Sequence, residues 1–253
     1  FLNNVDGTGD GNGVYARIAY GGLSLTNNTF SGGSSSGGGC DVLVSMASTG
    51  AKANVTLSHN TFRTEDCSSN VSLSAPTFGA GPSAMDAWLS GNLFATQTDS
   101  SPVQISGSVT AVSLGGNVNV GTPAWTEADD SDVVGLATGI GEIVDWGGHN
   151  VVVPLLADSN ALFASGCRAG VGRFLNYDQT GAARIARVDG SRVCTAGAYE
   201  PTSTPITTTA EREPDETCEN GGVDIVSGFD VDGDGELSGA EVVITRPICN
   251  QGA

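Results

Sequence analysis

The chain has 253 residues, including 37 glycines, and a formal net charge of −18 with one lysine among ten basic residues. This composition favours turn-rich β structure over helix bundles, and the acidic balance argues against nucleic-acid binding because phosphates would be repelled. No apolar run approaches the length of a transmembrane helix. The chain opens abruptly at Phe1 with no secretory signal, so we expect a piece of a longer protein.

A short phrase recurs along residues 1–155: a leucine, two small or polar residues, an asparagine and, in three copies, a phenylalanine two positions later. The copies are Leu25–Phe30, Leu57–Phe62, Leu89–Phe94, the weaker Leu114–Asn119 and the degenerate Trp146–Asn150. Counted from Asn28, the asparagines recur after 32, 32, 25 and 33 residues. Such a period indicates a solenoid or a propeller.

Each strong copy follows an alternating apolar run, as in Ala53-Val55-Leu57, which is typical of a half-buried strand. We therefore predict an all-β fold, a right-handed parallel β-helix over residues 1–155. Its turns should place Asn28, Asn60 and Asn92 in one hydrogen-bonded column, with the phenylalanines stacked inside. The alternative is a β-sandwich or jelly roll, whose strands are not translationally equivalent. The acidic stretch 122–132 is expected to interrupt the repeats as a loop.

The six cysteines fall into three sequence-local pairs. The chain has no CxxC pair and its two histidines stand apart, which argues against zinc. Six cysteines allow fifteen connectivities, but pairing of nearest neighbours keeps each bridge inside one local unit. Bridged cysteines predict an oxidising, extracytoplasmic setting, either secreted or at the cell surface. The expected disulfides are Cys40–Cys67, Cys167–Cys194 and Cys218–Cys249.

Residues 156–200 change character and carry two short motifs, 178–184 (Asp-Gln-Thr-Gly-Ala-Ala-Arg) and 197–200 (Gly-Ala-Tyr-Glu). These motifs resemble the end of bacterial choice-of-anchor Q surface proteins, although Thr180 stands where that family commonly has arginine. The resemblance implies a β-helix that finishes with a C-terminal cap. A cap is also physically reasonable, because the last coil of a solenoid exposes strand edges. Within it we expect Arg184 and Glu200 to form a structural ion pair.

A Pro/Thr-rich stretch, residues 201–217, is expected to be an extended linker to a small module at 218–253. Residues 230–241 match the twelve-residue EF-hand calcium loop, with Gly235 at its sharp turn. The alternative is a solvated acidic loop. A related loop at Asp6–Asn12 lacks a distal bidentate carboxylate and is better explained as a β-turn. The predicted Ca²⁺ ligands are Asp230, Asp232, Asp234, the carbonyl of Glu236, Ser238 and Glu241.

The flanks of this loop differ from those of a calcium sensor. Residues 221–229 and 242–247 alternate like strands, so no paired helices would open a groove and the calcium should be structural. The cysteines at 218 and 249 bracket the loop, and a disulfide with a metal is the expected support for so small a core. The segment resembles small Cys-bracketed calcium-loop repeats of bacterial surface proteins.

Two classes of function follow from these patterns. The first is a non-enzymatic surface protein, a β-helical stalk, adhesin or fibre subunit, with a glycan or cell-surface ligand and head-to-tail self-association as candidate partners. The second is a polysaccharide lyase or hydrolase, which needs clustered bases and carboxylates. The repeats offer only Arg17, Lys52 and Arg63 as bases, in no recognisable motif. We therefore assign no catalytic residues.

Overall fold

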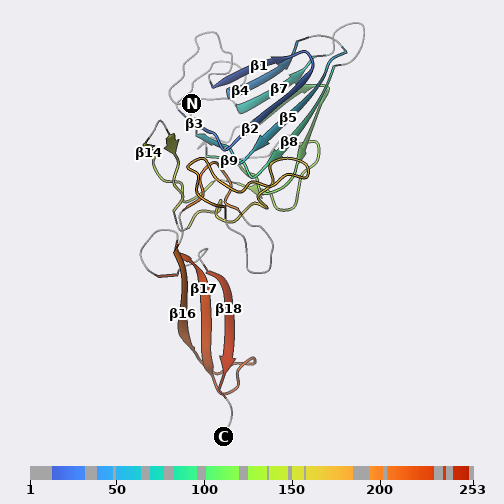
Figure 1. The fold of residues 1–253 in the computed structure, drawn as a ribbon. Helices are drawn as coiled ribbons and strands as arrows, with labels where there is room; N and C mark the ends of the chain where they lie inside the picture. Colours follow the sequence, from blue (N-terminus) through green and yellow to red (C-terminus); the bar gives the residue numbers. More distant parts are fainter. Residues whose placement is uncertain are drawn as a thin grey trace.

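The computed structural model describes residues 13–31, 39–47, 50–63, 69–76, 83–95, 101–119, 125–135, 137–147, 150–156, 158–184, 194–201, 204–230, 236–237 and 242–250. Within these ranges the regular secondary structure is β-strand throughout, which confirms the predicted all-β class (Figure 1). None of these residues belongs to a helix that is long and apolar enough to cross a membrane.

The first part of the chain forms three parallel sheets that take successive strands from successive repeats. We number the repeats 1 (residues 13–31), 2 (39–63), 3 (69–95) and 4 (101–119), and the sheets in the order in which each repeat enters them. Sheet 1 holds β1 (Val14–Ile18), β4 (Gly39–Met46), β7 (Ser69–Ala75) and β10 (Val103–Gly107). Sheet 2 holds β2 (Gly21–Thr26), β5 (Lys52–Ser58), β8 (Ala84–Ser90) and β11 (Val109–Ser113). Sheet 3 holds β3 (Thr29–Ser31), β6 (Thr61–Arg63), β9 (Leu93–Phe94), β12 (Val118–Asn119) and β13 (Val133–Val134).

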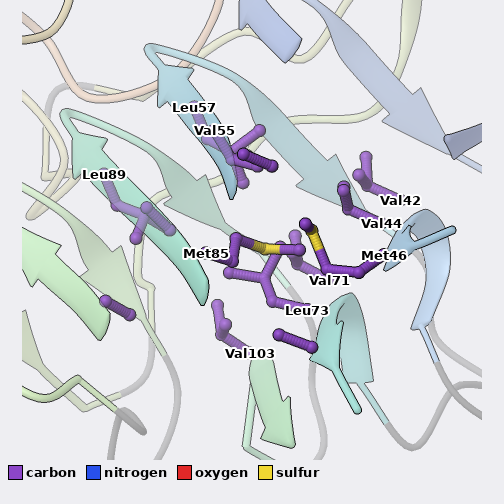
Figure 2. Packing of buried hydrophobic residues seen from close by; sticks show 14 of the residues in the cluster. Val42, Val44, Met46, Val55, Leu57, Val71, Leu73, Met85, Leu89 and Val103 are labelled. Carbon is purple, nitrogen blue, oxygen red and sulfur yellow. The ribbon is translucent and has the colours of Figure 1, made fainter. Parts of the chain in front are cut away.

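The register between strands repeats the sequence pattern. Leu25 pairs with Leu57, and Leu57 pairs with Leu89, so each apolar side chain lies beside its counterpart in the next repeat. These side chains point into one core that strands of all three sheets enclose. Figure 2 shows the part of this core to which sheets 1 and 2 contribute. Its labelled members are Val42, Val44, Met46, Val55, Leu57, Val71, Leu73, Met85, Leu89 and Val103.

The phenylalanines of the recurring phrase form a stack from sheet 3, as predicted. The ring centroids of Phe30 and Phe62 are 5.1 Å apart, and those of Phe62 and Phe94 are 5.0 Å apart. The rings are inclined by only 8° and 9° to each other, and all three side chains are fully buried. The spacing matches that of neighbouring strands, so the strand pairing itself imposes the near-parallel geometry.

The asparagines form a continuous ladder at the turn between sheets 2 and 3, which confirms the predicted column. Asn28 Nδ2 donates to Asn60 Oδ1 at 3.0 Å, and Asn60 Nδ2 donates to Asn92 Oδ1 at 3.1 Å. Asn92 Nδ2 continues the ladder to Asn117 Oδ1 at 3.0 Å. Each acceptor Oδ1 also receives the backbone N–H of the preceding asparagine.

The leucine of the phrase completes this ladder. Asn60 Nδ2 also donates to the carbonyl of Leu25, and Asn92 Nδ2 to that of Leu57. Both donors and both acceptor sites of the buried carboxamide are then used, so its burial leaves no unpaired polar group. The spacing of three residues between leucine and asparagine is what brings this carbonyl to the next repeat.

The residue just before each ladder asparagine has a left-handed backbone. Asn27, His59, Gly91 and Gly116 have φ values of 56°, 52°, 58° and 70°. Glycine adopts this region freely, and asparagine and histidine are among the few other residues enriched there. The turn therefore tolerates all four residues, and it does not by itself explain why repeat 2 carries a histidine.

The ladder ends in the carboxylate of Asp132. Asp132 Oδ1 accepts both the backbone N–H and Nδ2 of Asn117, at 2.9 and 3.0 Å. The degenerate copy of the phrase at Trp146–Asn150 does not continue the parallel sheets, because Asn150 lies in the antiparallel pair β14 (Val144–Gly147) and β15 (Asn150–Val152). The last position needs only an acceptor, which suits an acidic side chain.

The acidic stretch at 122–132 was expected to interrupt the repeats, but its described part continues them. Glu127 forms a parallel bridge with Val112, and β13 follows to pair with β12. The parallel sheets therefore end near residue 134, and the predicted boundary at 155 lies too late. Large apolar residues are sparse in this stretch, so the sequence alone predicts a loop there.

The outer face of sheet 3 carries a second, smaller core. Leu93 and Val118 on this face pack with Leu155, Leu162 and Ala196, which all come from beyond the repeats. We call residues 158–184 and 194–200 the covering segment. It was expected to cap the last coil, but its hydrogen bonds reach the turns of repeats 1, 2 and 3, so it lies along the row of turns.

A separate antiparallel sheet follows, made of β16 (Thr204–Arg212), β17 (Gly222–Asp230) and β18 (Val242–Cys249) (Figure 1). The expected linker at 201–217 is therefore wrong over 204–212, where nine residues pair in register with β17. The β-branched threonines and Ile206 of this stretch favour a strand, and its proline, Pro205, lies next to the strand's first residue.

Candidate functional site

The predicted calcium loop connects two antiparallel strands. Asp230 is the last residue of β17, β18 begins at Val242, and Gly228 pairs with Val242 at the base of the connection. Both expected strand flanks are thus confirmed. Glu236 is exposed, and the Asp230 side chain and residues Asp232, Asp234, Ser238 and Glu241 lie outside the described residues. The earlier loop at 6–12 lies outside them as well.

Within the described part of the chain, no group of three His, Cys, Asp or Glu side chains is placed to hold a metal. Because four of the six predicted ligands are not among these residues, this observation does not bear on the loop.

Two of the three predicted disulfides are present. Cys167–Cys194 joins the two parts of the covering segment, and Cys218–Cys249 closes the antiparallel sheet at the end opposite the calcium loop. Both bonds favour an oxidising environment. The predicted pair Cys40–Cys67 lies outside the described side chains.

The covering segment holds a buried ion pair at its centre. Arg184 Nη1 donates to Glu200 Oε2 at 2.8 Å, and the side chains are 0% and 1% exposed. Arg184 also donates to the carbonyls of Thr195 and Gly197 and to Asn27 Oδ1 of repeat 1. The expected structural pairing of Arg184 with Glu200 is confirmed.

Charge and burial act against each other in this pair. Burial lowers the pKa of Arg184 and raises the pKa of Glu200, because both charged forms lose water. The opposite charge of the partner resists each shift, and Asp178 adds to the field that keeps Arg184 protonated. Glu200 gains further support from the backbone N–H and hydroxyl of Thr195.

The two motifs of the covering segment come together around this pair. Gln179 N donates to the carbonyl of Ala198 and Glu200 N donates to Asp178 Oδ2. Asp178 Oδ1 accepts from Thr180 N and Ala182 N, which fixes the turn between Asp178 and Arg184. Both motifs are therefore explained as one folding unit.

The covering segment also contacts repeat 2 through a polar group that sequence reasoning missed. His59 is fully buried, and its Nε2 lies 2.9 Å from Ser165 Oγ. Burial and the charge of Arg184 lower the pKa of His59 well below its ordinary value, against a smaller opposing effect of the Arg168 carbonyl. The sequence signal for this contact is a histidine at the position where repeats 1, 3 and 4 have asparagine or glycine.

The candidate bases of the repeats are not brought together. Arg17 is on β1 in sheet 1 and Lys52 on β5 in sheet 2, whereas Arg63 is on β6 in sheet 3. Arg63 donates to the carbonyl of Gly141 and pairs with the exposed Glu142 at 3.2 Å.

Comparison with known families gives one match, to a domain of unknown function, DUF7151, over residues 205–249. This range begins within β16 and ends with β18, so the similarity covers the antiparallel sheet and not the repeats. No curated protein and no solved structure matches the chain.

Proposed function

We propose that the chain is a non-enzymatic structural protein of the cell surface or extracellular space, a stalk, adhesin or fibre subunit built on a right-handed parallel β-helix. The observation that carries this proposal is the asparagine ladder, which runs through four repeats and ends at Asp132. Three parallel sheets with one strand per repeat are the arrangement expected of stacked coils. The ladder asparagines form hydrogen bonds with one another, and Arg184 of the covering segment pairs with Glu200, so these buried polar groups have structural partners.

The two disulfides support an extracytoplasmic location. The acidic charge suits a calcium-containing medium, and residues 210–253 carry eleven acidic and two basic side chains. We propose that Ca²⁺ binds at Asp230, Asp232, Asp234, Glu236, Ser238 and Glu241, where it would tie the β17–β18 connection and offset part of this repulsion.

The metal site is tested by limited proteolysis. Calcium should protect residues 218–253, and chelation should remove that protection. Glu241→Gln should lose it too, because the bidentate carboxylate is gone, whereas Glu219→Gln outside the loop should keep it. Equal cleavage of the wild type with and without calcium would refute the site.

The non-enzymatic role is tested with a panel of acidic and neutral polysaccharides. We expect neither new reducing ends nor unsaturated products that absorb in the ultraviolet. Either product, lost in a variant of a single basic or acidic residue, would establish the alternative of a lyase or hydrolase. Electron microscopy of the purified chain separates filaments from monomers and so tests head-to-tail association.

A further inference from the structure

The turn of repeat 2 carries a histidine where the equivalent turns carry asparagine or glycine. Asn27, Gly91 and Gly116 occupy this position in repeats 1, 3 and 4, all with positive φ. The turn alone does not require a histidine, because glycine adopts positive φ without strain. The imidazole of His59 must therefore be explained by what it contacts.

The ring is enclosed between repeat 3 and the covering segment. His59 N donates to the carbonyl of Ser90, and a Cβ added to Gly91 would lie 2.6 Å from both His59 Nε2 and Ser165 Oγ. Gly91 thus allows the ring and the serine to meet across the interface. His59 Nδ1 is buried without a hydrogen-bond partner, so the neutral ring fits here. The Arg168 carbonyl favours the protonated ring, but its effect is smaller than those of burial and of Arg184.

The charged groups around the ring disfavour a further positive charge. The charge of Arg184 acts on the ring to lower its pKa, and Glu200 and Asp178 in turn oppose the charge of Arg184. Arg168 offers its backbone carbonyl, which Ser90 Oγ also uses at 2.7 Å, while its exposed side chain acts on Asp129. Among the described side chains, no carboxylate is paired with His59.

We propose that His59 is an acid-sensitive latch, which holds the covering segment on the row of turns when neutral and releases it when protonated. Protonation would place an unpaired imidazolium beside Arg184 in a dry interface, and opening lets water reach the ring. The direction of the pH effect follows from linkage. A histidine held neutral in the closed state contributes fully to the stability of that state above its unfolded pKa of about 6.5, and this contribution is lost as the pH falls below that value.

Amide hydrogen exchange at about pH 7.5 and about pH 5, corrected for intrinsic rates, tests the latch. The reporters are Gly197 and Ala198, whose N–H groups donate to the Gly91 carbonyl and to Thr61 Oγ1. The equilibrium constant for opening at these two amides should increase by up to ~30-fold in the wild type. This factor is ten raised to the power 6.5 − 5, the difference between the unfolded histidine pKa and the lower pH. Leu93 and Ala95 of repeat 3, bonded to repeat 2, should keep their protection.

Three variants distinguish the titration of His59 from the simple loss of its contact with Ser165. His59→Asn copies the residue of repeat 1 and should abolish the pH dependence whatever its baseline, with His59→Gly as a second turn-compatible version. Ser165→Ala keeps the titrating ring and should raise opening at both pH values while retaining the pH dependence. The proposal is overturned if His59→Asn opens with acid as the wild type does, if the wild type does not respond, or if Leu93 and Ala95 open in parallel.

Discussion

The ladder asparagines show how one residue can be required by its neighbours above and below. Asn60 bonds Asn28, Asn92 and the carbonyl of Leu25, all within the buried turn. Asn60→Ala would leave several buried groups without partners, at ~1–3 kcal/mol for each. We expect a loss on the order of 3 kcal/mol or more in urea unfolding.

The matched control is Asn54→Ala, on the exposed face of β5, the strand that precedes the turn holding Asn60. It should change the free energy of unfolding by less than ~0.5 kcal/mol. Equal effects of the two substitutions would mean that the ladder contributes no more than an exposed asparagine.

Phe62 tests the aromatic stack in the same way, because it is the middle ring and stacks on both Phe30 and Phe94. Phe62→Ala should cost ~3–5 kcal/mol and Phe62→Leu markedly less, since leucine fills most of the space. Thermal and urea unfolding of both variants measure this order. A larger loss for leucine than for alanine would contradict the packing.

At the scale of the element, the covering segment depends on charge that is fully removed from water. Glu200→Gln would leave Arg184 buried beside an uncharged partner, with an expected loss of ~3–5 kcal/mol. The control is Glu142→Gln, which removes an exposed carboxylate that pairs with Arg63, and a change below ~1 kcal/mol is expected there. Comparable losses of stability in the two variants would show that burial of the Arg184–Glu200 pair does not increase its contribution.

The Cys167–Cys194 bond closes a loop of 27 residues within the covering segment. In the chain-entropy model such a bond stabilises by ~3–4 kcal/mol. The double Cys→Ser variant should release residues 194–200 to proteases while the parallel sheets persist, as circular dichroism would report. Unchanged protease resistance would contradict this role.

The elements differ in how far the sequence could predict them. The recurring phrase sufficed for the ladder and the phenylalanine stack, because the same three roles return at a fixed spacing. Asp132 and residues 125–134 were missed because the repeat shortens to 15 residues and an acid replaces the amide. The place of the covering segment was missed because it rests on contacts between residues over 100 positions apart, such as His59 with Ser165. No local pattern encodes such contacts.

β16 was missed for a different reason. Its Thr-rich sequence has few apolar residues, and it becomes a strand by pairing along β17. A short-range pattern of prolines and threonines cannot distinguish such a strand from an extended linker.

For the whole molecule, the net charge of −18 should oppose folding through self-repulsion. Added NaCl should therefore raise the unfolding midpoint, because the Debye length falls to ~3 Å at 1 M. If the proposed loop binds calcium, CaCl₂ should raise the unfolding midpoint more than NaCl does at equal ionic strength. Thermal melts at matched ionic strength measure both effects, and a midpoint that falls with NaCl would contradict the repulsion.

The most direct test of the stacked, hydrogen-bonded column is the exchange of side-chain carboxamide protons, followed by nuclear magnetic resonance. Asn60 and Asn92 are fully buried with both Nδ2 protons donated, whereas Asn54 faces solvent. The account predicts that the carboxamides of Asn60 and Asn92 exchange orders of magnitude more slowly than that of Asn54. Similar rates at all three side chains would contradict the ladder and the scaffold role inferred from it.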